Sequence, residues 1–397
     1  MVEADYKTTP FFDMHTASQA KMASFAGYHM PMSYPLGALR EHLHCRAEAA
    51  LFDVSHMGQL EIELSSGKDT ASALLALETV IPSNLAQLAE GRQRYGLLLN
   101  ERGGICDDLM VMHGPGFVRL VVNAATTDND IRWLSEHLPD YRVKKLDRAL
   151  LALQGPKAAD VLARLLPGLN SDDLISPDLT SMGFMQLAVF SFQGDEVVIS
   201  RSGYTGEDGF EISLNLKHAS DFAEQILAQP EVEWAGLIAR DSLRMEAGLP
   251  LYGQDMDETV SVAEAGLSWA VGTARRRGGV REGGFIGSER TLSDADNAGA
   301  DKTGADNTGG LIVCGVKAGK GPPARAGAPI FADESSEQPI GVITSGGPAP
   351  SCGYSVAMVR ISSAYAEQPH LFADVRGRKV LLERTEMPFI PHRYYRP

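Results

Sequence analysis

One segment of the sequence cannot contribute to a packed core. Residues 294–310, DADNAGADKTGADNTGG, contain no bulky hydrophobic side chain and consist largely of Gly, Ala, Asn and Asp. Such a composition cannot bury enough apolar surface to offset the entropy of ordering it, so we expect a flexible linker or an exposed insertion. The segment therefore predicts a large region over 1–290, a linker over 291–310 and a separate unit over 311–397.

The length and the charge of the chain limit its architecture and its partners. A chain of 397 residues, 44% hydrophobic and 22% charged, is expected to form roughly two or three globular domains. The formal net charge of -15 argues against nucleic acid as a partner, because phosphate binding needs a basic surface. It argues equally against an anionic membrane surface. A local exception is the basic run Arg275–Arg277.

Cysteine usage and the N-terminal sequence bear on the compartment. The cysteines are dispersed and form no CxxC pair, which predicts reduced thiols in a reducing compartment. The start MVEADYKTTPFFDMH resembles neither a signal peptide nor an Arg-rich transit peptide. No apolar run approaches the roughly 18–20 residues that span a bilayer. We therefore expect a cytoplasmic protein, in the bacterial cytosol or, if eukaryotic and processed, in the mitochondrial matrix.

Hydrophobic patterns predict a mixture of helices and strands over the large region. Residues 36–52 carry apolar residues at helical spacing and many good helix formers, which predicts a helix. Strands are also predicted over 95–100, 105–112, 117–123, 149–155 and 210–215, and helices over 156–166 and 237–248. The first three strands, with a turn at ERGG (101–104), read as an antiparallel meander, and Gly248 should end the last helix.

The last part of the chain has a different pattern. Short strand-like runs separated by Gly and Pro turns follow the linker: LIVCGVK, IGVITSG, YSVAMVRI and KVLLERT. This spacing is typical of a small all-β barrel or jelly-roll unit. The predicted fold class is therefore α+β, with mixed α/β domains followed by a C-terminal all-β barrel.

Common cofactor and metal motifs are absent from the sequence. It contains no P-loop, no GxGxxG between a strand and a helix, and no GxSxG elbow. His42, His44 and Cys45 crowd one short helical segment without ligand pairs at i, i+4, so we interpret His42, His44 and His56 as surface and interface histidines. The aspartates of the linker lack the full ligand set of an EF-hand. We expect no metal site.

Two adjacent carboxylates follow the ERGG turn. Asp107 and Asp108 lie on one predicted strand, and alternation places their side chains on opposite faces. One of them could face a pocket while the other faces outward. A carboxylate in a partly apolar pocket suits the binding of an amine-rich heterocycle or the handling of a proton. An acid pair on an edge strand is the structural alternative.

Two further segments carry candidate binding residues. In RSGYTGEDGFEI (201–212), glycines permit close approach of a planar ligand, Tyr204 could stack on it, and Glu211 could accept two hydrogen bonds from an amidine-like N–H pair. The segment ARDSLRMEAGLPLYGQDMDE (239–258) supplies Arg240 on a helix face and Tyr252 just beyond that helix.

Taken together, these segments resemble the glycine cleavage T-protein, or aminomethyltransferase, family. The similarity extends over nearly the whole chain apart from 294–310. It is carried by TTPFFDMH (8–15), FAGYHMPMSY (25–34), EHLHCRAEAALFDVSHMG (41–58), LNERGGICDDLMV (99–111), LALQGPKAADVL (151–162), SGYTGEDGFEIS (202–213), LIARDSLRMEAGLPLYGQDMDE (237–258), FIGSE (285–289), IGVITSGGPAPSCGYSVAM (340–358) and MPFIPHRYYRP (387–397).

The resemblance implies a fold and a set of site residues. It implies three domains arranged like a cloverleaf, the last a β-barrel, with tetrahydrofolate in a central channel. Asp108 falls at the position of the family's essential aspartate, which contacts the tetrahydrofolate amines, and Glu211 at that of the glutamate that holds the pterin. The other positions that match the folate pocket are Met57, Tyr95, Val121, Asn123, Tyr204, Arg240, Tyr252 and Tyr394.

The resemblance also implies a reaction. The family's donor is an aminomethyl group on the lipoyl arm of H-protein, and tetrahydrofolate is the acceptor and co-substrate. Ammonia leaves and 5,10-methylenetetrahydrofolate results, so lipoate enters only as the arm of the partner. Arg240 and Arg275–Arg277 could meet the folate carboxylates or an acidic H-protein, although solvated surface arginines explain the basic run equally well.

Relatives on the same scaffold provide alternatives. One is a tetrahydrofolate-dependent demethylase of a small methylated sulfur or nitrogen compound, which would share the pterin-binding residues. Another is a folate-binding factor that assists iron–sulfur assembly and carries the motif KGCYxGQE, where this chain reads GGFIGSE (283–289) without the cysteine. Flavin-linked relatives carry an additional dinucleotide domain, for which this chain has no motif.

Overall fold

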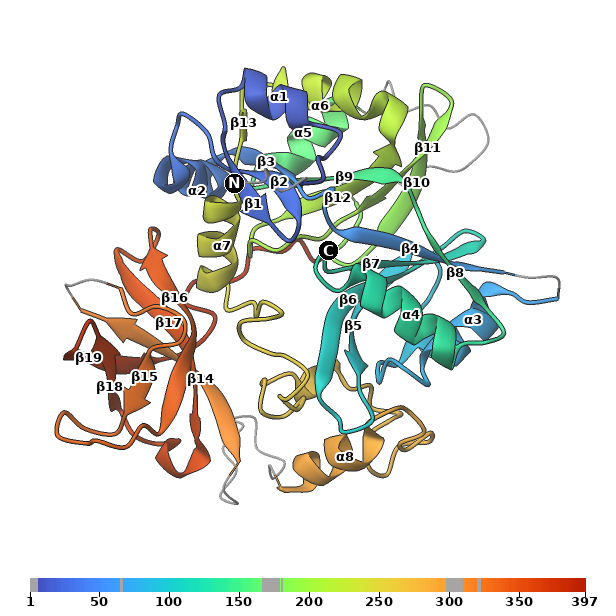
Figure 1. Ribbon diagram of the computed structural model, residues 1–397. Coiled ribbons are helices and arrows are strands. Elements are labelled where there is room, and N and C mark those ends of the chain that lie inside the picture. Colours follow the sequence, from blue (N-terminus) through green and yellow to red (C-terminus); the bar gives the residue numbers. More distant parts are fainter. Residues whose placement is uncertain (1–5, 65–66, 166–178, 180, 298–309, 320–322) are drawn as a thin grey trace.

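The computed structural model describes residues 6–64, 67–165, 179, 181–297, 310–319 and 323–397. Within this part of the chain the strands form a two-stranded hairpin, a six-stranded sheet, a five-stranded sheet and a closed six-stranded barrel. Figure 1 shows the barrel at one side of the two larger sheets, with a helix, α7, between the barrel and the six-stranded sheet. The expected combination of mixed α/β domains with a C-terminal β-barrel is confirmed.

The six-stranded sheet contains the largest apolar core. Its strands in spatial order are β10 (Leu187–Phe192), β11 (Asp195–Ser200), β12 (Gly209–Asn215), β9 (Arg148–Gln154), β3 (Ala49–Asp53) and β13 (Val232–Trp234). Helices α1 (Phe12–Ala17), α5 (Ala158–Leu165) and α6 (Ala219–Leu227) pack on one face (Figure 1). Their apolar side chains, among them Phe222 and Val161, share one buried cluster with Leu151 and Phe210 of the sheet. Such burial is the main stabilising term of the unit.

One predicted helix proved to be two elements. Residues 36–52 form helix α2 (Ala38–Ala47) and then strand β3, in which all five residues are buried. β3 pairs with β9 on one side and with β13 on the other. This pairing in the middle of a sheet outweighs the helix propensity of the Ala-rich sequence, because propensity is weak beside tertiary burial.

The five-stranded sheet contains the predicted meander. Its strands in spatial order are β5 (Arg92–Leu99), β6 (Ile105–Gly114), β7 (Phe117–Val122), β4 (Gly58–Glu63) and β8 (Arg142–Lys145), and α3 (Thr70–Leu77) and α4 (Thr127–His137) supply apolar side chains to its core. β5, β6 and β7 are antiparallel neighbours joined by short turns, as expected. β6 lies between two partners, so the structural alternative of an acid pair on an edge strand is wrong.

The two sheets meet along a shared apolar cluster. Phe52 and Val198 of the six-stranded sheet pack with Met112 and Val121 of the five-stranded sheet, and Leu243 of α7 (Leu237–Glu246) joins them. Gly248, at φ +64°, ends α7 as predicted, since glycine adopts this left-handed conformation without a steric penalty. The hairpin of β1 (Lys21–Phe25) and β2 (Tyr28–Ser33) lies beside this seam, and β2 contacts α7.

Residues after α7 form a third, smaller core before the barrel. Met256, Val260 and Phe285 bury Leu97 and Ile105, which lie at the ends of β5 and β6. Helix α8 (Ser288–Asn297) follows, so the first residues of the expected linker are helical, and Asp294 pairs with Arg290 at 3.5 Å. The remainder of the expected linker, 298–309, lies outside the described residues.

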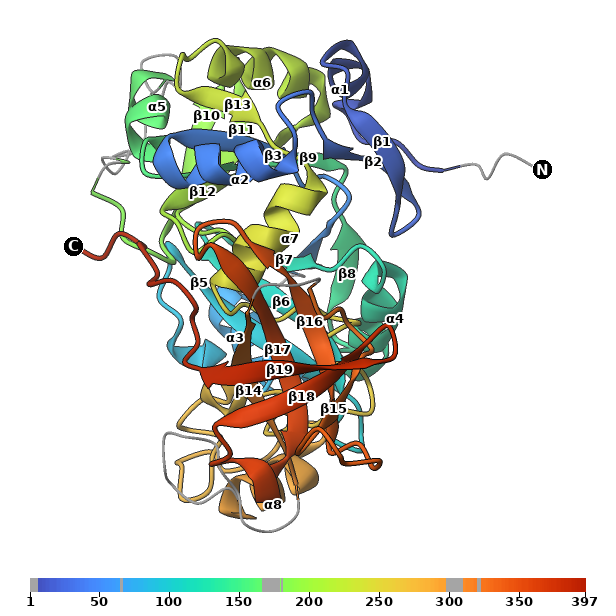
Figure 2. The ribbon, with the colours of Figure 1, turned by 90° about the vertical axis from the view of Figure 1, so that its left-hand side faces the viewer.

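The C-terminal barrel closes as predicted. Its strands in order around the barrel are β14 (Leu311–Ala318), β17 (Tyr354–Ser362), β16 (Gly341–Ala349), β15 (Pro329–Phe331), β18 (His370–Val375) and β19 (Arg378–Thr385). After β19 the chain leaves the barrel and returns to the six-stranded sheet (Figure 2). There Arg393 N–H donates to the Gly206 carbonyl and Phe184 N–H donates to the Tyr395 carbonyl. None of the described helices combines the length and the apolarity needed to cross a lipid bilayer.

The turn before β6 should be sensitive to added volume. A Cβ atom at Gly104 would lie 1.8 Å from the Glu258 carbonyl oxygen, so we expect Gly104→Ala to lower the free energy of unfolding by on the order of 2–4 kcal/mol. Gly116, in the turn between β6 and β7, has φ +73° and open space around it. Gly116→Ala should cost only about 1 kcal/mol, from conformation alone. Urea unfolding of both variants measures the difference, and equal losses would contradict the steric argument.

Candidate active site

Asp108 lies on β6, where the five-stranded sheet approaches the six-stranded one. The Tyr95 hydroxyl donates to Asp108 Oδ2 at 3.0 Å, and Asn123 Nδ2 donates to Asp108 Oδ1 at 2.8 Å. Burial, and next the charge of Asp107, raise the pKa of Asp108 to about 7. A carboxyl group with this pKa can either hold or release a proton near neutral pH.

Asp107 does not face outward, contrary to one expectation. Its side chain is buried, and it accepts hydrogen bonds from the backbone N–H of Asn123 at 3.0 Å and from Asn123 Nδ2 at 2.8 Å. Asp130 of α4 lies beside it, and burial, followed by the charge of Asp130, raises the pKa of Asp107. Alternation does separate the two carboxylates, but the face opposite Asp108 is covered by α4 instead of water.

Tyr204, Arg240 and Glu211 form a second group. The Tyr204 hydroxyl donates to the Pro250 carbonyl, and the Arg240 guanidinium carbon lies 5.0 Å from the centroid of the Tyr204 ring. Glu211 on β12 accepts a hydrogen bond from Ser202 Oγ at 2.8 Å. Arg240 Nη1 is buried and has no hydrogen-bond partner among the described residues. Since buried donors are normally satisfied, this nitrogen marks a place where a ligand acceptor could bind.

The charges of the two groups influence each other's pKa values, so the two groups lie near one another. Burial raises the pKa of Tyr95, with further contributions from Asp108 and Tyr204. Burial lowers the pKa of Arg240, and the charge of Glu211 opposes that effect. These residues come from β5, β6, β12, α7 and the turn before β12, so segments far apart in the sequence lie near one another here.

The remaining pocket candidates supply apolar surface. Val121 is buried in the cluster between the two sheets, and Met57 packs against the same cluster. Tyr252 and Tyr95 both pack against the small third core. Mostly apolar walls with a few convergent polar groups are what binding sites for small molecules usually have.

A cavity of about 730 Å³ opens beside Tyr95. Phe184, Trp269 and Arg276 line part of it, and Trp269 stacks on Tyr95 with ring centroids 5.2 Å apart. Tyr394 is not among the described residues that line this cavity, but it stacks on Phe184 at 4.0 Å. The structure thus connects Tyr394 with the cavity wall and not with Asp108.

Trp269 and Phe184 were not predicted from the sequence. Trp269 is 63% exposed, which is unusual for so large an apolar side chain and suits a ligand-stacking surface. The available signal was the tryptophan itself, one of three in the chain, in a segment without a helix or strand pattern. Phe184 gave no signal, because its place in the cavity depends on the C-terminal residues that stack on it.

The basic run at 275–277 does not form a continuous patch. Arg275 is buried, forms an ion pair with Glu78 at 3.2 Å and donates to the Gly283 carbonyl at 3.1 Å. Arg276 donates to the Val271 carbonyl at 2.9 Å and lines the cavity. The expectation that all three arginines could meet a partner is therefore wrong for Arg275, whose charge is used inside the protein.

The histidines were predicted to be surface and interface residues. The surface part is wrong for His42 and His56, whereas His42 does lie at an interface, with its Nε2 3.0 Å from Ser351 Oγ of the barrel. His42 and His56 are buried, while His44 is half-buried and its Nε2 lies 2.9 Å from the Glu231 carbonyl. Burial lowers the pKa of His56 to about 4, so its imidazole is neutral at physiological pH. Over the described residues, no three His, Cys, Asp or Glu side chains are grouped so that they could hold a metal ion.

Comparison with known proteins identifies the family. The model of the GCVT N-terminal domain matches residues 11–275, and the model of the glycine cleavage T-protein C-terminal barrel domain matches residues 312–390. The chain belongs to the glycine cleavage T-protein family. The candidate site residues from Met57 to Tyr252 fall within the first T-protein match, and Tyr394 lies just beyond the second.

Individual T-protein relatives match along most of their length. The mitochondrial aminomethyltransferase of Flaveria trinervia is 37% identical over 407 residues, covering 100% of this chain and 92% of the relative. The mitochondrial aminomethyltransferase of Dictyostelium discoideum is 34% identical, covering 98% of this chain and 94% of the relative. The crystal structure of glycine cleavage system aminomethyltransferase T from Bartonella henselae has a TM-score of 0.85 at 38% identity, covering 99% of this chain and 100% of that one.

The raised pKa of Asp108 makes a prediction about stability. A carboxyl group whose pKa is higher in the folded than in the unfolded protein favours folding only while it is protonated, and this contribution is lost as the pH rises from about 4 to about 7. Asp108→Asn cannot ionise. We therefore expect it to stabilise the protein, relative to wild type, by on the order of 1–2 kcal/mol more at about pH 8 than at about pH 5.5.

Denaturant unfolding at the two pH values measures this difference. Asp160→Asn on α5 is the matched control, because Asp160 is exposed and its replacement should have a similar effect at both pH values. A stability gain for Asp108→Asn that does not depend on pH would contradict the assignment of a raised pKa to Asp108.

Proposed function

We propose that this chain transfers the methylene carbon of an aminomethyl group, carried on the lipoyl arm of H-protein, to tetrahydrofolate, releasing ammonia and forming 5,10-methylenetetrahydrofolate. Membership of the T-protein family over nearly the whole chain supports this proposal. The observation that carries it is the carboxyl group of Asp108. Tyr95 and Asn123 hold this group beside the apolar cluster between the two sheets, and its pKa lies near neutrality.

In this proposal different site residues bind different parts of the folate. Asp108 faces the amines that take part in the reaction, and Glu211 binds the N–H groups of the pterin. Arg240, whose Nη1 has no partner among the described residues, donates to an acceptor of the folate. Tyr204 and Tyr252 pack on the ring system over Met57 and Val121, and Tyr394 acts through Phe184 on the cavity wall.

The proposed reaction balances with one proton-accepting group. N5 of tetrahydrofolate forms a bond to the methylene carbon as the carbon–sulfur bond breaks, and N10 then displaces ammonia. N5 and N10 each lose a proton, while the lipoyl sulfur and the leaving amine each gain one. Asp108 accepts a proton from the folate amine and returns it to a leaving group, which its pKa permits in both directions. Holding both reactants in one site supplies much of the remaining rate.

Partners and compartment follow from the same proposal. Tetrahydrofolate is a co-substrate, lipoate enters only on H-protein, and neither nucleic acid nor a membrane takes part. The relatives from Flaveria and Dictyostelium are named mitochondrial. For this chain, the bacterial cytosol or the mitochondrial matrix stays a prediction. The division into 1–290, with two intertwined subdomains, 291–310 and 311–397 is likewise our proposal.

The alternative functions have less support. The relatives are named aminomethyltransferases, which does not favour a tetrahydrofolate-dependent demethylase. The iron–sulfur assembly factor would need a cysteine in the motif that contains Phe285, and Phe285 is buried in the third core. Ammonia release from aminomethylated H-protein distinguishes the proposed reaction from both alternatives, because neither of them produces ammonia from this donor.

The two adjacent carboxylates should differ sharply in this assay. Asp108→Asn keeps the shape but removes the proton-accepting group, so turnover should fall by about 10²–10⁴-fold. Asp107→Asn should be far milder, since Asp107 is turned toward Asp130 of α4 and contacts the site through Asn123, whose side-chain amide also donates to Asp108. Circular dichroism serves as the folding control. If Asp107→Asn were the inactive variant, Asp107 and not Asp108 would be the proton-accepting group. Two active variants would contradict the proposed mechanism.

A further inference from the structure

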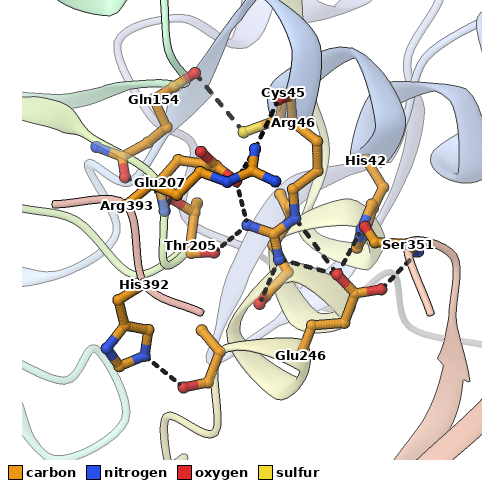
Figure 3. Close-up of polar contacts among 12 residues, drawn as sticks. His42, Cys45, Arg46, Gln154, Thr205, Glu207, Glu246, Ser351, His392 and Arg393 are labelled. Carbon is orange, nitrogen blue, oxygen red and sulfur yellow. Dashed lines mark hydrogen bonds and ion pairs between the residues drawn. The ribbon is translucent and has the colours of Figure 1, made fainter. Parts of the chain in front are cut away.

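A buried arginine lies between the two segments that carry Tyr204 and Arg240. Arg46 comes from helix α2, which contributes none of the site residues described above (Figure 3). Its side chain is 7% exposed, and its guanidinium points into the gap between helix α7 and the turn at 204–207.

On one side, Arg46 holds the turn that follows Tyr204. Nη1 donates to the Thr205 carbonyl at 2.6 Å and to Glu207 Oε1 at 2.9 Å. The turn has little room to move, because Thr205 Oγ1 also donates to Gln154 Oε1 at 2.8 Å. A Cβ atom at Gly206 would lie 2.8 Å from the Cβ atom of Ala247. The position of the Tyr204 ring therefore follows that of the turn.

On the other side, Arg46 holds helix α7. Nη2 donates to the Leu243 carbonyl at 3.3 Å and to Glu246 Oε2 at 3.0 Å. Glu246 is fully buried, and its second oxygen accepts from the backbone N–H of Ser351 in the barrel at 2.8 Å. Arg240 lies on the same helix, so one guanidinium joins the elements that carry both members of the Tyr204–Arg240 pair.

The C-terminal segment adds a second contact to the same turn. Arg393 N–H donates to the Gly206 carbonyl at 2.8 Å, and Arg393 Nη1 lies 3.4 Å from Glu207 Oε1. Next to it, His392 Nε2 lies 2.8 Å from the Ala247 carbonyl at the end of α7 (Figure 3). Two guanidiniums thus balance the two buried carboxylates of Glu207 and Glu246, which makes the burial of these charges tolerable.

We propose that Arg46 is a positioning residue for the Tyr204–Arg240 pair, and that Arg393 of the C-terminal segment gives the same turn a second support. The inference rests on the proposed function only in taking this pair as part of the folate pocket. A guanidinium carries five donors in a rigid plane, so it can bind acceptors on two elements at once. A lysine ammonium keeps the charge but cannot span both elements.

Arg46→Lys tests this role through steady-state kinetics with tetrahydrofolate and aminomethylated H-protein. Losing the hydrogen bonds of the Arg46 guanidinium displaces residues of the folate pocket but not the reacting groups. We therefore expect KM for tetrahydrofolate to rise about tenfold while kcat stays within about twofold. KM for H-protein should not change. Arg164→Lys is the matched control, since Arg164 pairs with Glu231 at 2.8 Å on the surface of α5. It should leave all three constants unchanged.

A double-mutant cycle separates positioning from general destabilisation. In a Tyr204→Leu background, Arg46→Lys should raise KM for tetrahydrofolate by less than about twofold further, because the ring that Arg46 positions is gone. An equal increase in both backgrounds would show that Arg46 does not act through Tyr204 and would overturn the proposal.

Arg393→Gln provides an independent variant should Arg46→Lys not fold. The Arg393 side chain is 58% exposed, so the fold should tolerate the change, and KM for tetrahydrofolate should rise about threefold. An unchanged KM in every variant that folds would overturn the positioning role. If the wild-type protein released no ammonia, the proposed function would fail instead. Equilibrium binding of tetrahydrofolate to the same variants would then decide the positioning role.

Discussion

The cost of burying charged side chains determines how the parts of this molecule fit together. Glu246 and Glu207 are almost completely buried, and a buried carboxylate is tolerable only when it is paired and hydrogen-bonded. Arg46 satisfies both of them, and Ser351 and Arg393 complete the set from the barrel and the C-terminal segment. The barrel and the six-stranded sheet therefore cannot separate without exposing or unpairing these charges.

Helix α7 connects these buried charge pairs with the candidate site. Arg244, also buried, forms an ion pair with Asp255 at 2.9 Å and donates to Ser345 Oγ of the barrel at 2.9 Å. Together with Glu246 it holds one end of the helix, while Arg240 lies nearer the other end beside Tyr204. A helix fixed by buried charges can hold Arg240, whose Nη1 has no hydrogen-bond partner among the described residues, with little freedom, and such preorganisation favours ligand binding.

The burial of Asp108 is compensated differently from that of Glu207 and Glu246. No cation contacts it in the described residues, and its hydrogen bonds come from the neutral donors Tyr95 and Asn123. Burial consequently raises its pKa instead of being offset by an ion pair. Paired charges around Arg46 stabilise the arrangement of the elements, whereas Asp108, which has no ion-pair partner among the described residues, has a pKa near neutrality and in our proposal transfers the proton. This separation is common where stability and chemistry place opposite demands on a buried charge.

Local patterns in the sequence were sufficient for the meander of β5 to β7, the end of α7 at Gly248 and the barrel strands, because these depend on period, turns and glycine conformations. Motifs spread along the chain identified the family, and the same resemblance predicted the site residues and the choice of Asp108 over Asp107. Long-range pairing alone decided that residues 49–53 form a buried strand. Packing from distant segments decided that Asp107 and Arg275 turn inward, that Trp269 stacks on Tyr95, and that Arg46 bridges α7 and the Tyr204 turn. Burial depends on spatial neighbours, which a sequence pattern does not specify.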